Sequence, residues 1–453
     1  MTVETINPWT GAVEYRYEYF SDDEVERRLA AAARAYPAWA ALSFAERADL
    51  IRRTAALLRE HRERIAGLMT AEMGKLRREA LAEIEKSAGA CEYYAGQAET
   101  YMQDKHIATE ASRSFVAYEP IGCVFAVMPW NFPIWQVFRF LAPGLMAGNV
   151  ALLKHATNVP RCADVIAEIL RLAGIPEGVF DVLHIDNQRA GAVIADPRVH
   201  AITLTGSERA GKSVAGNAGA NLKKCVMELG GSDPFVVLDD ADLDKAVPVA
   251  AASRFGNGGQ TCIAAKRFIL TPGIAEEFVA RFTAAAAALK SGDPNDDATT
   301  LAPMVRPDAR EELQRQVDAS IAAGAKLLIG GRKGEGPCDY PATILDAVGP
   351  GMAAYSEELF GPVASIIRAD SVEDAIHIAN DTAFGLGASV WTRDKAQGEA
   401  VARRIQAGAV FVNALVRSDV RLPFGGTKTS GFGRELAEHG IHEFMNIKTV
   451  YVD

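Results

Sequence analysis

Residues 199–213 read VHAITLTGSERAGKS: an apolar run, a glycine turn and then a segment of helical composition. A short apolar run that ends in a turn is typical of a buried strand. A strand that leads through a glycine turn into a helix is the start of a βαβ unit, and the free backbone amides at such a helix N-terminus bind anionic groups. The stretch therefore predicts an α/β fold with a parallel sheet.

Strand-like and helix-like segments alternate on both sides of this stretch. The other strand-like segments are IGCVFAVMP (121–129), NVALLK (149–154), VFDVLH (179–184), LKKCVMELGG (222–231), DPFVVLDD (233–240), KLLIGG (326–331), PVASIIRA (362–369), ASVWT (388–392) and GAVFVN (408–413). The helix-like segments are 136–148, 162–174, 208–220, 275–290 and 371–381. This alternation predicts two α/β halves that meet near residue 230.

The two ends of the chain have different patterns. Ser21 followed by Glu24 is typical of a helix N-terminus, and apolar residues recur at spacings of three and four over 46–75 and again over 79–101. These segments predict amphipathic helices. The final segment, NIKTVYVD (446–453), alternates like a strand that pairs with another part of the structure or with another subunit.

Composition limits the class of protein. The chain has 453 residues, enough for two or three domains, and its 49% hydrophobic and 23% charged residues exclude a mostly disordered chain. The net charge of −10, without a long basic block, makes binding to nucleic acid or to an anionic membrane a poor hypothesis. No apolar run approaches the roughly 18 residues that a membrane-spanning helix needs.

Cysteine usage predicts a compartment. None of the six cysteines forms a CxxC pair or a close cluster, and the start, MTVETINPWTG, lacks the pattern of a secretory signal. We therefore expect a cytoplasmic protein with free thiols. His439 and His442 form HxxH without a further ligand at a recognisable spacing, so we expect no metal site.

The segment GSERAGKS (206–213) matches the phosphate-loop pattern GxxxxGK[ST], and VVLDD (236–240) resembles the acidic strand that holds magnesium in nucleotide hydrolases. Alone, these segments favour a phosphate-loop NTPase that uses Lys212 and Ser213. The same pattern also fits another nucleotide-binding turn, or a plain turn whose Lys212 faces solvent. The motif by itself leaves all three open.

Two further segments favour nucleophilic chemistry. FGNGGQTCIAAKRF (255–268) places Cys262 in a glycine-rich turn, where backbone amides near a helix N-terminus raise the thiolate fraction. The alternative is a small buried cysteine. MELGG (227–231) places Glu228 at the end of a strand-like run, where ligands bind in α/β proteins; the alternative is a surface carboxylate beside a flexible turn.

The loop PWNFP (129–133) follows an apolar strand, and its two prolines bracket a tryptophan, an asparagine and a phenylalanine. A rigid loop of this kind can hold the Asn131 amide at a fixed point, which an oxyanion stabiliser requires. The alternative is a prolyl turn with packed aromatic side chains.

Together these segments resemble the aldehyde dehydrogenase superfamily over nearly the whole chain. The ordered set is PWNFP (129–133), Lys154 after NVALL, LTGSERAG (204–211), ELGGSDPFVVLDDAD (228–242), GGQTC (258–262), EELFGPV (357–363) and PFGGTKTSGFGRE (423–435). Seven segments in the family's order are more specific than one eight-letter pattern. The resemblance implies a Rossmann-like cofactor domain, an α/β catalytic domain and a small β oligomerisation element.

The resemblance also implies a mechanism. Cys262 would attack an aldehyde carbonyl as a thiolate, and the Asn131 amide and the Cys262 backbone N–H would hold the developing oxyanion. Hydride would then leave for a nicotinamide ring, and Glu228 would activate the water that hydrolyses the resulting thioester. The implied cofactor residues are Trp130, Lys154, Thr157, Gly206, Ser207, Gly211, Glu358 and Phe360.

The cofactor would be NAD or NADP. Many family members carry a glutamate three residues after the lysine, where it binds the adenosine ribose hydroxyls. This chain has Thr157 there, which removes repulsion against a 2′-phosphate.

The substrate implied is succinate semialdehyde, with other aliphatic or aromatic aldehydes as the alternative. Arg139 lies where succinate-semialdehyde dehydrogenases carry an arginine for the substrate carboxylate; its alternative is a surface or interface arginine. The family's second carboxylate arginine is replaced by Gly256, and Arg254, Arg417 or Arg421 could substitute for it.

The resemblance implies a domain division as well. We expect a cofactor-binding domain at 1–102 and 121–229, a catalytic domain at 230–433, and an oligomerisation element at 103–120 and 434–453. The last implies a homodimer or homotetramer.

Overall fold

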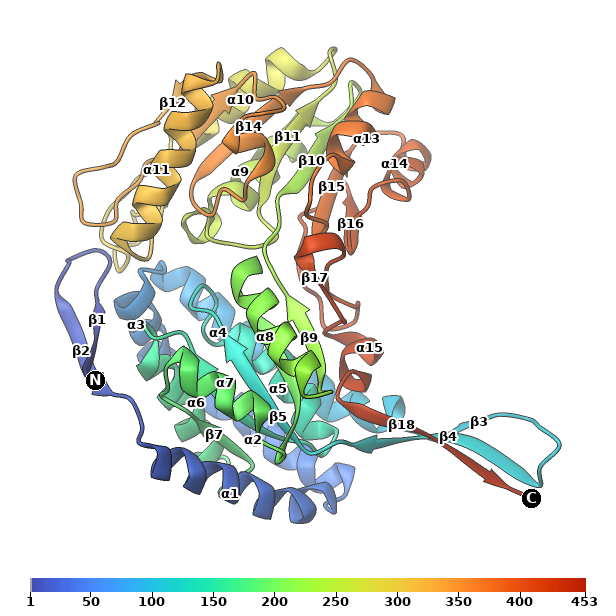
Figure 1. Ribbon diagram of the computed structural model, residues 1–453. Coiled ribbons are helices and arrows are strands. Elements are labelled where there is room, and N and C mark those ends of the chain that lie inside the picture. The colour runs from blue at the N-terminus through green and yellow to red at the C-terminus, as the bar shows by residue number, and fades with distance from the viewer. Residues whose placement is uncertain (1) are drawn as a thin grey trace.

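The computed structural model describes residues 2–453 (Figure 1). It contains a six-stranded and a seven-stranded sheet, each packed with helices, and a long β arm that projects from the body. The predicted α/β fold with parallel sheets is therefore present.

The six-stranded sheet contains the apolar run Val199–Thr205 as β8. Its order is β17-β9-β8-β5-β6-β7, and all neighbours are parallel except β17 and β9. The strands are β5 (Cys123–Met128), β6 (Val150–His155), β7 (Phe180–Val182), β8 (Val199–Thr205), β9 (Lys224–Glu228) and β17 (Gly431–Phe432). Each of the first five coincides with a predicted strand-like segment.

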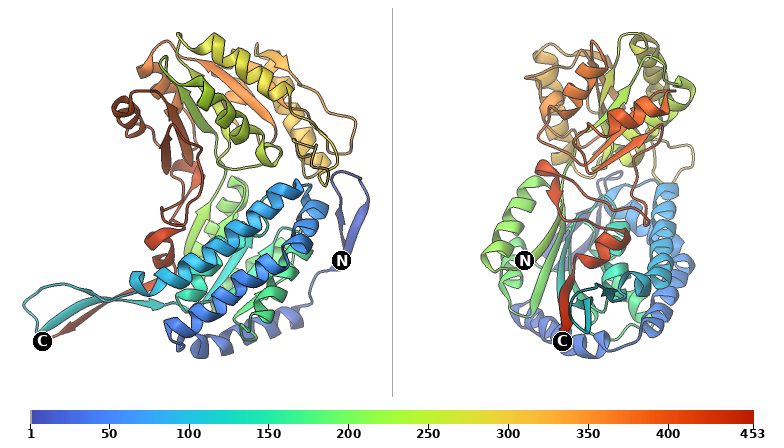
Figure 2. Two further views of the ribbon diagram at one scale, coloured as in Figure 1. Left: turned by 180° about the vertical axis from the view of Figure 1, so that it is seen from behind. Right: turned by 90° about the vertical axis from the view of Figure 1, so that its right-hand side faces the viewer.

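Helices cover both faces of this sheet, with α7 and α8 on one side and α2 to α4 on the other (Figure 2). The helices of this half are α1 (Asp22–Ala40), α2 (Phe44–Glu60), α3 (Arg62–Met73), α4 (Arg77–Tyr101), α5 (Trp135–Met146), α6 (Pro160–Leu172), α7 (Asn187–Ala195) and α8 (Glu208–Ala220). Ser21 caps α1 through the Glu24 backbone N–H, and Ser43 forms a full capping box with Glu46 at α2.

The seven-stranded sheet has the order β12-β13-β14-β11-β10-β15-β16, in which only β12 and β13 are antiparallel. The strands are β10 (Asp233–Val237), β11 (Ala265–Leu270), β12 (Lys326–Ile329), β13 (Thr343–Asp346), β14 (Val363–Arg368), β15 (Gly387–Trp391) and β16 (Ala409–Val412). The helical elements are α9 (Leu243–Phe255), η1 (Gly256–Gly259), α10 (Ala275–Ala287), α11 (Pro307–Ala322), α12 (Ala353–Ser356), α13 (Val372–Asn380), α14 (Lys395–Ala402) and η2 (Lys428–Ser430).

Strand β11 was not among the strand-like segments of the sequence. It contains Lys266 and Arg267, and both side chains are buried. Two adjacent cations interrupt the apolar run that marks a buried strand, so the pattern conceals it. Burial is possible because Arg267 donates hydrogen bonds to the carbonyls of Ser232, Ile378 and Ala379.

The arm is a three-stranded antiparallel sheet of order β18-β4-β3, made of β3 (Lys105–His106), β4 (Arg113–Pro120) and β18 (Met445–Val452). The alternating C-terminal segment is thus a strand, and it pairs with β4 of its own chain. The arm extends away from both sheets and carries the C-terminus at its tip (Figure 2). The short helix α15 (Ala437–His442) precedes β18, and β1 (Thr2–Ile6) and β2 (Val13–Glu18) form a separate hairpin.

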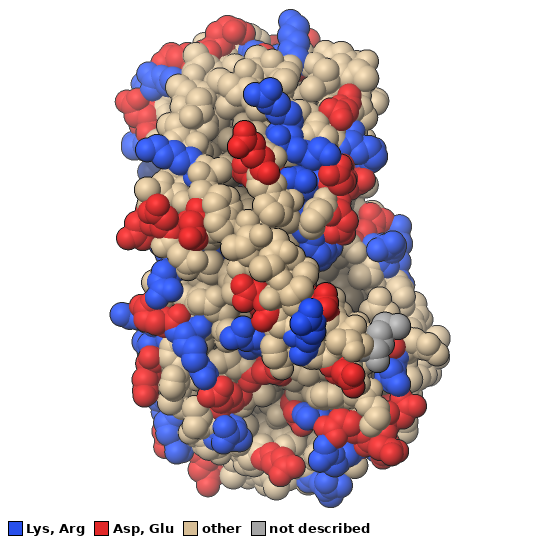
Figure 3. Space-filling model, turned by 90° about the vertical axis from the view of Figure 1, so that its left-hand side faces the viewer, with Lys and Arg blue, Asp and Glu red and all other residues tan. Residues whose placement is uncertain are grey.

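Surface charge and hydropathy agree with the composition. On the face drawn in Figure 3, acidic and basic side chains are interspersed and do not gather into one patch. Within residues 2–453, no helix is both long and apolar enough to cross a membrane.

Candidate active site

The carboxyl ends of β5, β8 and β9 meet the Cys262 loop at a cavity of about 280 Å³, here called the proximal cavity. It joins both halves of the chain, because its walls come from loops of both sheets. Seven predicted site residues line it: Trp130, Asn131, Gly206, Ser207, Cys262, Glu358 and Phe360. Segments more than two hundred residues apart are thereby brought to one place.

Asn131 is held by its neighbours on all sides. Its side-chain Nδ2 donates to the Gln260 carbonyl at 3.0 Å, and its Oδ1 accepts from Gln136 Nε2 at 3.1 Å. Its own backbone carbonyl accepts from Lys75 Nζ and from Asn257 Nδ2. The amide is therefore fixed beside the Cys262 loop, as an oxyanion stabiliser must be.

Cys262 lies in a loop between η1 and β11. Its carbonyl oxygen accepts a hydrogen bond from Lys266 Nζ at 2.7 Å. Burial raises the pKa of the thiol to about 11, while the positive charges of Arg139 and Lys266 act in the opposite direction. In this state the sulfur is mainly a thiol at neutral pH, and a nearby proton acceptor or cation is needed to form the thiolate.

Glu228 ends β9, and its side chain lines neither cavity described here. Within residues 2–453, neither carboxylate oxygen has a hydrogen-bond partner. Burial, and next the negative charge of Glu435, raise the pKa of Glu228 well above its ordinary value. Burial and the Glu435 charge therefore both favour the protonated form of this side chain.

The turn after β8 forms a helix N-terminus of the kind that binds anions. Ser207 caps α8 by accepting from the Ala210 N–H, and the Gly206 N–H donates to the Glu228 carbonyl, which joins the ends of β8 and β9. Gly211 lets α8 approach the next strand, because a Cβ there would lie 2.6 Å from the Leu229 side chain.

Of the remaining predicted cofactor residues, Glu358 lines the proximal cavity, whereas Lys154 and Thr157 do not. Lys154 is buried on β6, and burial lowers the pKa of its amine. Glu358 accepts from the Gly231 N–H and lies 3.5 Å from Lys266 Nζ, while Thr157 is exposed and its carbonyl accepts from the Tyr17 hydroxyl. Four features suit a dinucleotide: a helix N-terminus, a carboxylate, a lysine, and a cavity lined by the Trp130 and Phe360 rings.

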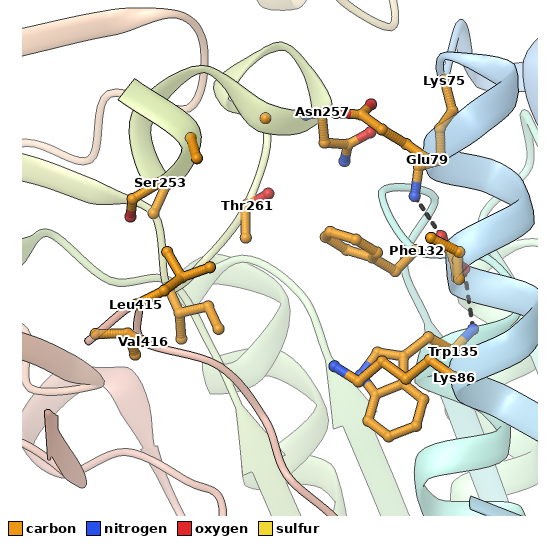
Figure 4. A pocket seen from close by; sticks show the side chains of 16 residues that line it. Lys75, Glu79, Lys86, Phe132, Trp135, Ser253, Asn257, Thr261, Leu415 and Val416 are labelled. Carbon is orange, nitrogen blue, oxygen red and sulfur yellow. Dashed lines mark hydrogen bonds and ion pairs between the residues drawn. The ribbon is translucent and has the colours of Figure 1, made fainter. Parts of the chain in front are cut away.

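A second cavity, here called the distal cavity, lies on the other side of the Cys262 loop and has a volume of about 300 Å³ (Figure 4). Its walls are mainly apolar, and Thr261 and Ile263, the neighbours of Cys262, line it. The loop thus separates the two cavities, with Cys262 itself facing the proximal one.

Arg139, the predicted carboxylate-binding residue, lines neither cavity. Its side chain is 2% exposed, pairs with Glu435 and donates to the Thr205 hydroxyl at 3.0 Å. The guanidinium also lies 4.8 Å from the centre of the Phe424 ring. Arg139 thus forms a buried ion pair within the protein, and its role as a carboxylate ligand stays a prediction. Arg254, one of the three suggested substitutes, is fully buried and donates to the Gly259 carbonyl.

Several residues that support the site were not predicted from the sequence. Lys75 and Glu83 form a buried ion pair, and one Glu83 oxygen accepts the backbone N–H groups of Ile134 and Trp135. Gln260 donates hydrogen bonds to the carbonyls of Asn257 and Pro303 and accepts one from the Val305 N–H. These residues act through contacts with distant loops, so no local spacing marks them.

The phosphate-loop hypothesis is not supported. Lys212 is exposed on α8 and pairs with Glu208, and Ser213 is exposed as well. In a phosphate loop both side chains would face the nucleotide. In the part of the chain that the structure describes, no group of three or more His, Cys, Asp or Glu residues is arranged to hold a metal ion.

Comparisons with known proteins agree with the geometry. A sequence model of the aldehyde dehydrogenase family matches residues 1–450. The chain is 50% identical over its full length to the full length of a probable succinate-semialdehyde dehydrogenase [NADP(+)] of Synechocystis sp.. It is 47% identical to the succinate semialdehyde dehydrogenase [NAD(P)+] Sad of Escherichia coli, over 99% of this chain and 97% of that protein.

Solved structures give the same result. The crystal structure of succinic semialdehyde dehydrogenase from Streptococcus pyogenes in complex with NADP+ superimposes with a TM-score of 0.97 at 37% identity, over 99% of each chain. The family model and the full-length relatives lead to one conclusion: the chain belongs to the aldehyde dehydrogenase family.

Proposed function

We propose that this protein oxidises succinate semialdehyde to succinate with NAD or NADP. The observation that carries the proposal is the position of the Cys262 loop between two cavities, one suited to a dinucleotide and one apolar with a cationic side chain. The names of the relatives from Synechocystis and Escherichia coli support the substrate and both cofactors.

In the proposed reaction, the Cys262 thiolate attacks the aldehyde carbon and forms a thiohemiacetal. Asn131 Nδ2 and the Cys262 backbone N–H donate to the developing oxyanion. The amide is suited to this role because its other contacts fix its position before substrate arrives, so no reorganisation is required at the transition state.

When bound, NAD or NADP would supply the hydride acceptor. We propose that the dinucleotide is held by Trp130, Phe360, Glu358, Lys154 and the Gly206–Gly211 turn. Thr157 supports use of NADP as well as NAD, because no carboxylate at that position repels a 2′-phosphate.

Hydrolysis of the Cys262 thioester is assigned to a water molecule activated by Glu228. Among the described residues the buried Glu228 carboxyl group has no hydrogen-bond partner, so no structural hydrogen bond occupies it. It must lose its proton to act as a base, and its raised pKa makes it a better proton acceptor once it has done so.

The predicted domain division is part of the proposal. We assign residues 1–102 and 121–229 to cofactor binding, 230–433 to catalysis, and 103–120 with 434–453 to assembly of a homodimer or homotetramer. Exposed apolar side chains on the arm support the last assignment, namely Ile107, Ile447, Tyr451 and Val452. We place the protein in the cytoplasm, where its unpaired cysteines stay reduced.

A direct assay tests the function. Purified protein supplied with succinate semialdehyde and NAD or NADP should generate the absorbance of the reduced nicotinamide, and Cys262→Ala should abolish turnover. Cys225→Ala is the matched control, because that half-buried cysteine lines neither cavity and its loss should leave turnover intact. Turnover that persists in Cys262→Ala would contradict the nucleophile assignment.

A further inference from the structure

Four of the residues that line the distal cavity are ionisable: Lys75, Glu79, Glu83 and Lys86. Lys75 and Glu83 form an ion pair with each other, and both side chains are buried. Removing two charges from water costs free energy, and an apolar pair of similar volume is often at least as stabilising. Stability is therefore a weak reason for an ion pair at this position.

Lys75 holds the backbone of Asn131. It lies in the turn between α3 and α4, and its Nζ donates to the Asn131 carbonyl at 2.8 Å. Nζ also lies 3.8 Å from the centre of the Phe132 ring, so Lys75 contacts two successive residues of the loop. Lys75, Phe132 and Trp135 lie on the same side of the distal cavity (Figure 4). The ammonium group is thus committed to contacts inside the protein.

Glu83 holds the other end of the same loop. Its Oε1 accepts the backbone N–H groups of Ile134 and Trp135, each at 2.9 Å, where α5 begins. The first N–H groups of a helix have no partner within the helix, and the N-cap of α5 is Ile134, whose apolar side chain cannot accept a hydrogen bond. The Glu83 carboxylate on α4 therefore replaces the missing cap, and its negative charge suits a helix N-terminus.

The ion pair fastens residues 131–135 to one neighbouring helix hairpin at both ends of the loop. The Asn131 side chain lies on the other side of the loop, where it lines the proximal cavity. An oxyanion donor is effective only at about 2.7–3.1 Å from the oxygen that it stabilises. A backbone shift of about 1 Å at this loop would therefore move the Asn131 amide out of range, and misplacement of that size can cost about 100-fold in rate.

We propose that the Lys75–Glu83 ion pair is a positioning device that sets the place of the Asn131 amide, and that its loss slows the reaction without weakening cofactor binding. The inference rests on the proposed function, because it requires Asn131 as the oxyanion donor. Lys75 and Glu83 act only through the backbone of residues 131–135. An oxyanion forms when Cys262 attacks the aldehyde and again when water attacks the thioester, so kcat depends on Asn131 whichever of these steps is slower.

Three variants separate positioning from stability. Lys75→Met removes the bond to the Asn131 carbonyl and leaves the Glu83 carboxylate unpaired. Glu83→Gln keeps a carbonyl oxygen that can accept the N–H groups of α5, but removes the charge that pairs with Lys75. Lys75→Met/Glu83→Gln removes both charges and keeps that acceptor. Urea unfolding measures the stability of each variant, and steady-state kinetics measure kcat and KM.

Each single variant should unfold at a lower urea concentration, because each leaves one buried charge without its partner. The double variant should recover much of that loss, because no unpaired charge remains. Its kcat for succinate semialdehyde should nevertheless stay about 10- to 100-fold below that of the wild type, since the Asn131 carbonyl still lacks Lys75. The KM for NADP should change less than about twofold, the result expected when an interaction of the transition state alone is lost.

Alkylation of Cys262 by iodoacetamide gives a readout that does not depend on turnover. It is a displacement at a saturated carbon and forms no oxyanion, so it needs no contribution from Asn131. The positive charges that act on the Cys262 thiol are those of Arg139 and Lys266, which the double variant retains. The alkylation rate should therefore equal that of the wild type. Lys75→Met alone should show the same contrast between alkylation and kcat, so the test does not depend on the double variant.

Glu72→Gln is the matched control. Glu72 is buried on α3, and its carboxylate accepts the N–H groups of Arg161 and Cys162 at the start of α6. The same chemical change there also removes a buried carboxylate that caps a helix, but this helix does not follow the Asn131 loop. Stability should fall, while kcat should stay within about twofold of the wild-type value.

The results distinguish this inference from the proposed function. A wild-type protein that does not turn over succinate semialdehyde overturns both. If the wild type is active and the double variant recovers kcat together with its stability, the ion pair only stabilises the fold and the inference is wrong. A loss of kcat in Glu72→Gln as large as that in Lys75→Met, or an alkylation rate that falls in parallel with kcat, would overturn it as well.

Discussion

At the level of single residues, the reactivity of Cys262 depends on a balance between burial and nearby cations. Burial disfavours the thiolate, whereas Lys266 and Arg139 favour it. Lys266 is fully buried within β11 and donates to the carbonyl of Cys262 itself, so its charge is held at a fixed place beneath the nucleophile. We therefore regard Lys266 as a positioning and electrostatic residue of the loop.

This balance predicts the pH dependence of Cys262 alkylation in the cofactor-free protein. Only the thiolate reacts, and the thiol pKa is about 11, so the rate of alkylation by iodoacetamide should rise continuously from pH 7 to pH 10. Lys266→Met removes a positive charge and should raise the pKa further, slowing alkylation at pH 9 about tenfold for each unit of increase. Mass spectrometry of the Cys262 peptide measures the rate.

Lys245→Met is a suitable control for this experiment, because Lys245 is exposed on α9 and pairs with Asp242. Equal alkylation rates in wild-type protein and Lys266→Met would show that Lys266 does not influence the thiol.

Residue identities were predictable from the sequence where a motif carries the chemistry. Asn131 and Cys262 both stand in such motifs, and the structure brings them to one cavity. Lys86 was not predictable, because a lysine on an amphipathic helix is normally a solvated side chain; its position in a cavity depends on Trp135 and Ser418, which come from other segments. For the same reason the pairing of Arg139 with Glu435 was not predictable, because Glu435 lies almost three hundred residues later.

At the level of elements, the approach of α8 to the sheet is set by one glycine. Alanine in a helix is normally favoured over glycine by about 0.5–1 kcal/mol. At Gly211, however, the added Cβ would lie 2.6 Å from Leu229, a residue that lines the proximal cavity. The helix N-terminus and the cavity wall are therefore coupled through this contact.

Gly211→Ala should accordingly lower the free energy of unfolding by about 1–3 kcal/mol, the usual cost of overpacking, and should raise the KM for NAD and NADP. Gly216→Ala on the same helix is the matched control, because nothing lies within 4 Å of its Cβ and the change should be neutral or stabilising. Urea unfolding and steady-state kinetics measure the two effects. Equal behaviour of both variants would mean that the Leu229 contact is unimportant.

Elements were predicted well where apolar runs are unbroken, as in β5, β6 and β8. The pattern failed at β11, where Lys266 and Arg267 are buried by partners that no local sequence reveals. It also did not anticipate β17, a two-residue strand whose only mark is its pairing with β9.

At the level of the whole molecule, the arm carries several exposed apolar side chains. Ile447 in β18 is 59% exposed, and Tyr451 and Val452 follow it on the same strand. Apolar side chains gathered on a projecting sheet mark an association surface. This is the physical basis of the proposed homodimer or homotetramer.

Ile447→Asp should weaken that association, because an interface then has to bury an unpaired carboxylate. We expect a rise of at least about tenfold in the dissociation constant, an effect of roughly 1.4 kcal/mol, measured by sedimentation velocity. Leu222→Asp, a change at a 96% exposed position outside the arm, should leave the assembly unaltered. A wild-type protein that sediments as a monomer would contradict the assembly proposal, and an unchanged Ile447→Asp assembly would contradict the role of β18.

The pairing of β17 with β9 also has a consequence for synthesis on the ribosome. The edge of the first sheet at β9 is complete only when Gly431 and Phe432 have emerged, after every strand of the second sheet has been made. Until then the growing chain presents an open β edge, which is the kind of surface that recruits chaperones or other nascent chains. We therefore expect truncation before residue 431 to yield an aggregating polypeptide, although both sheets would retain nearly all of their strands.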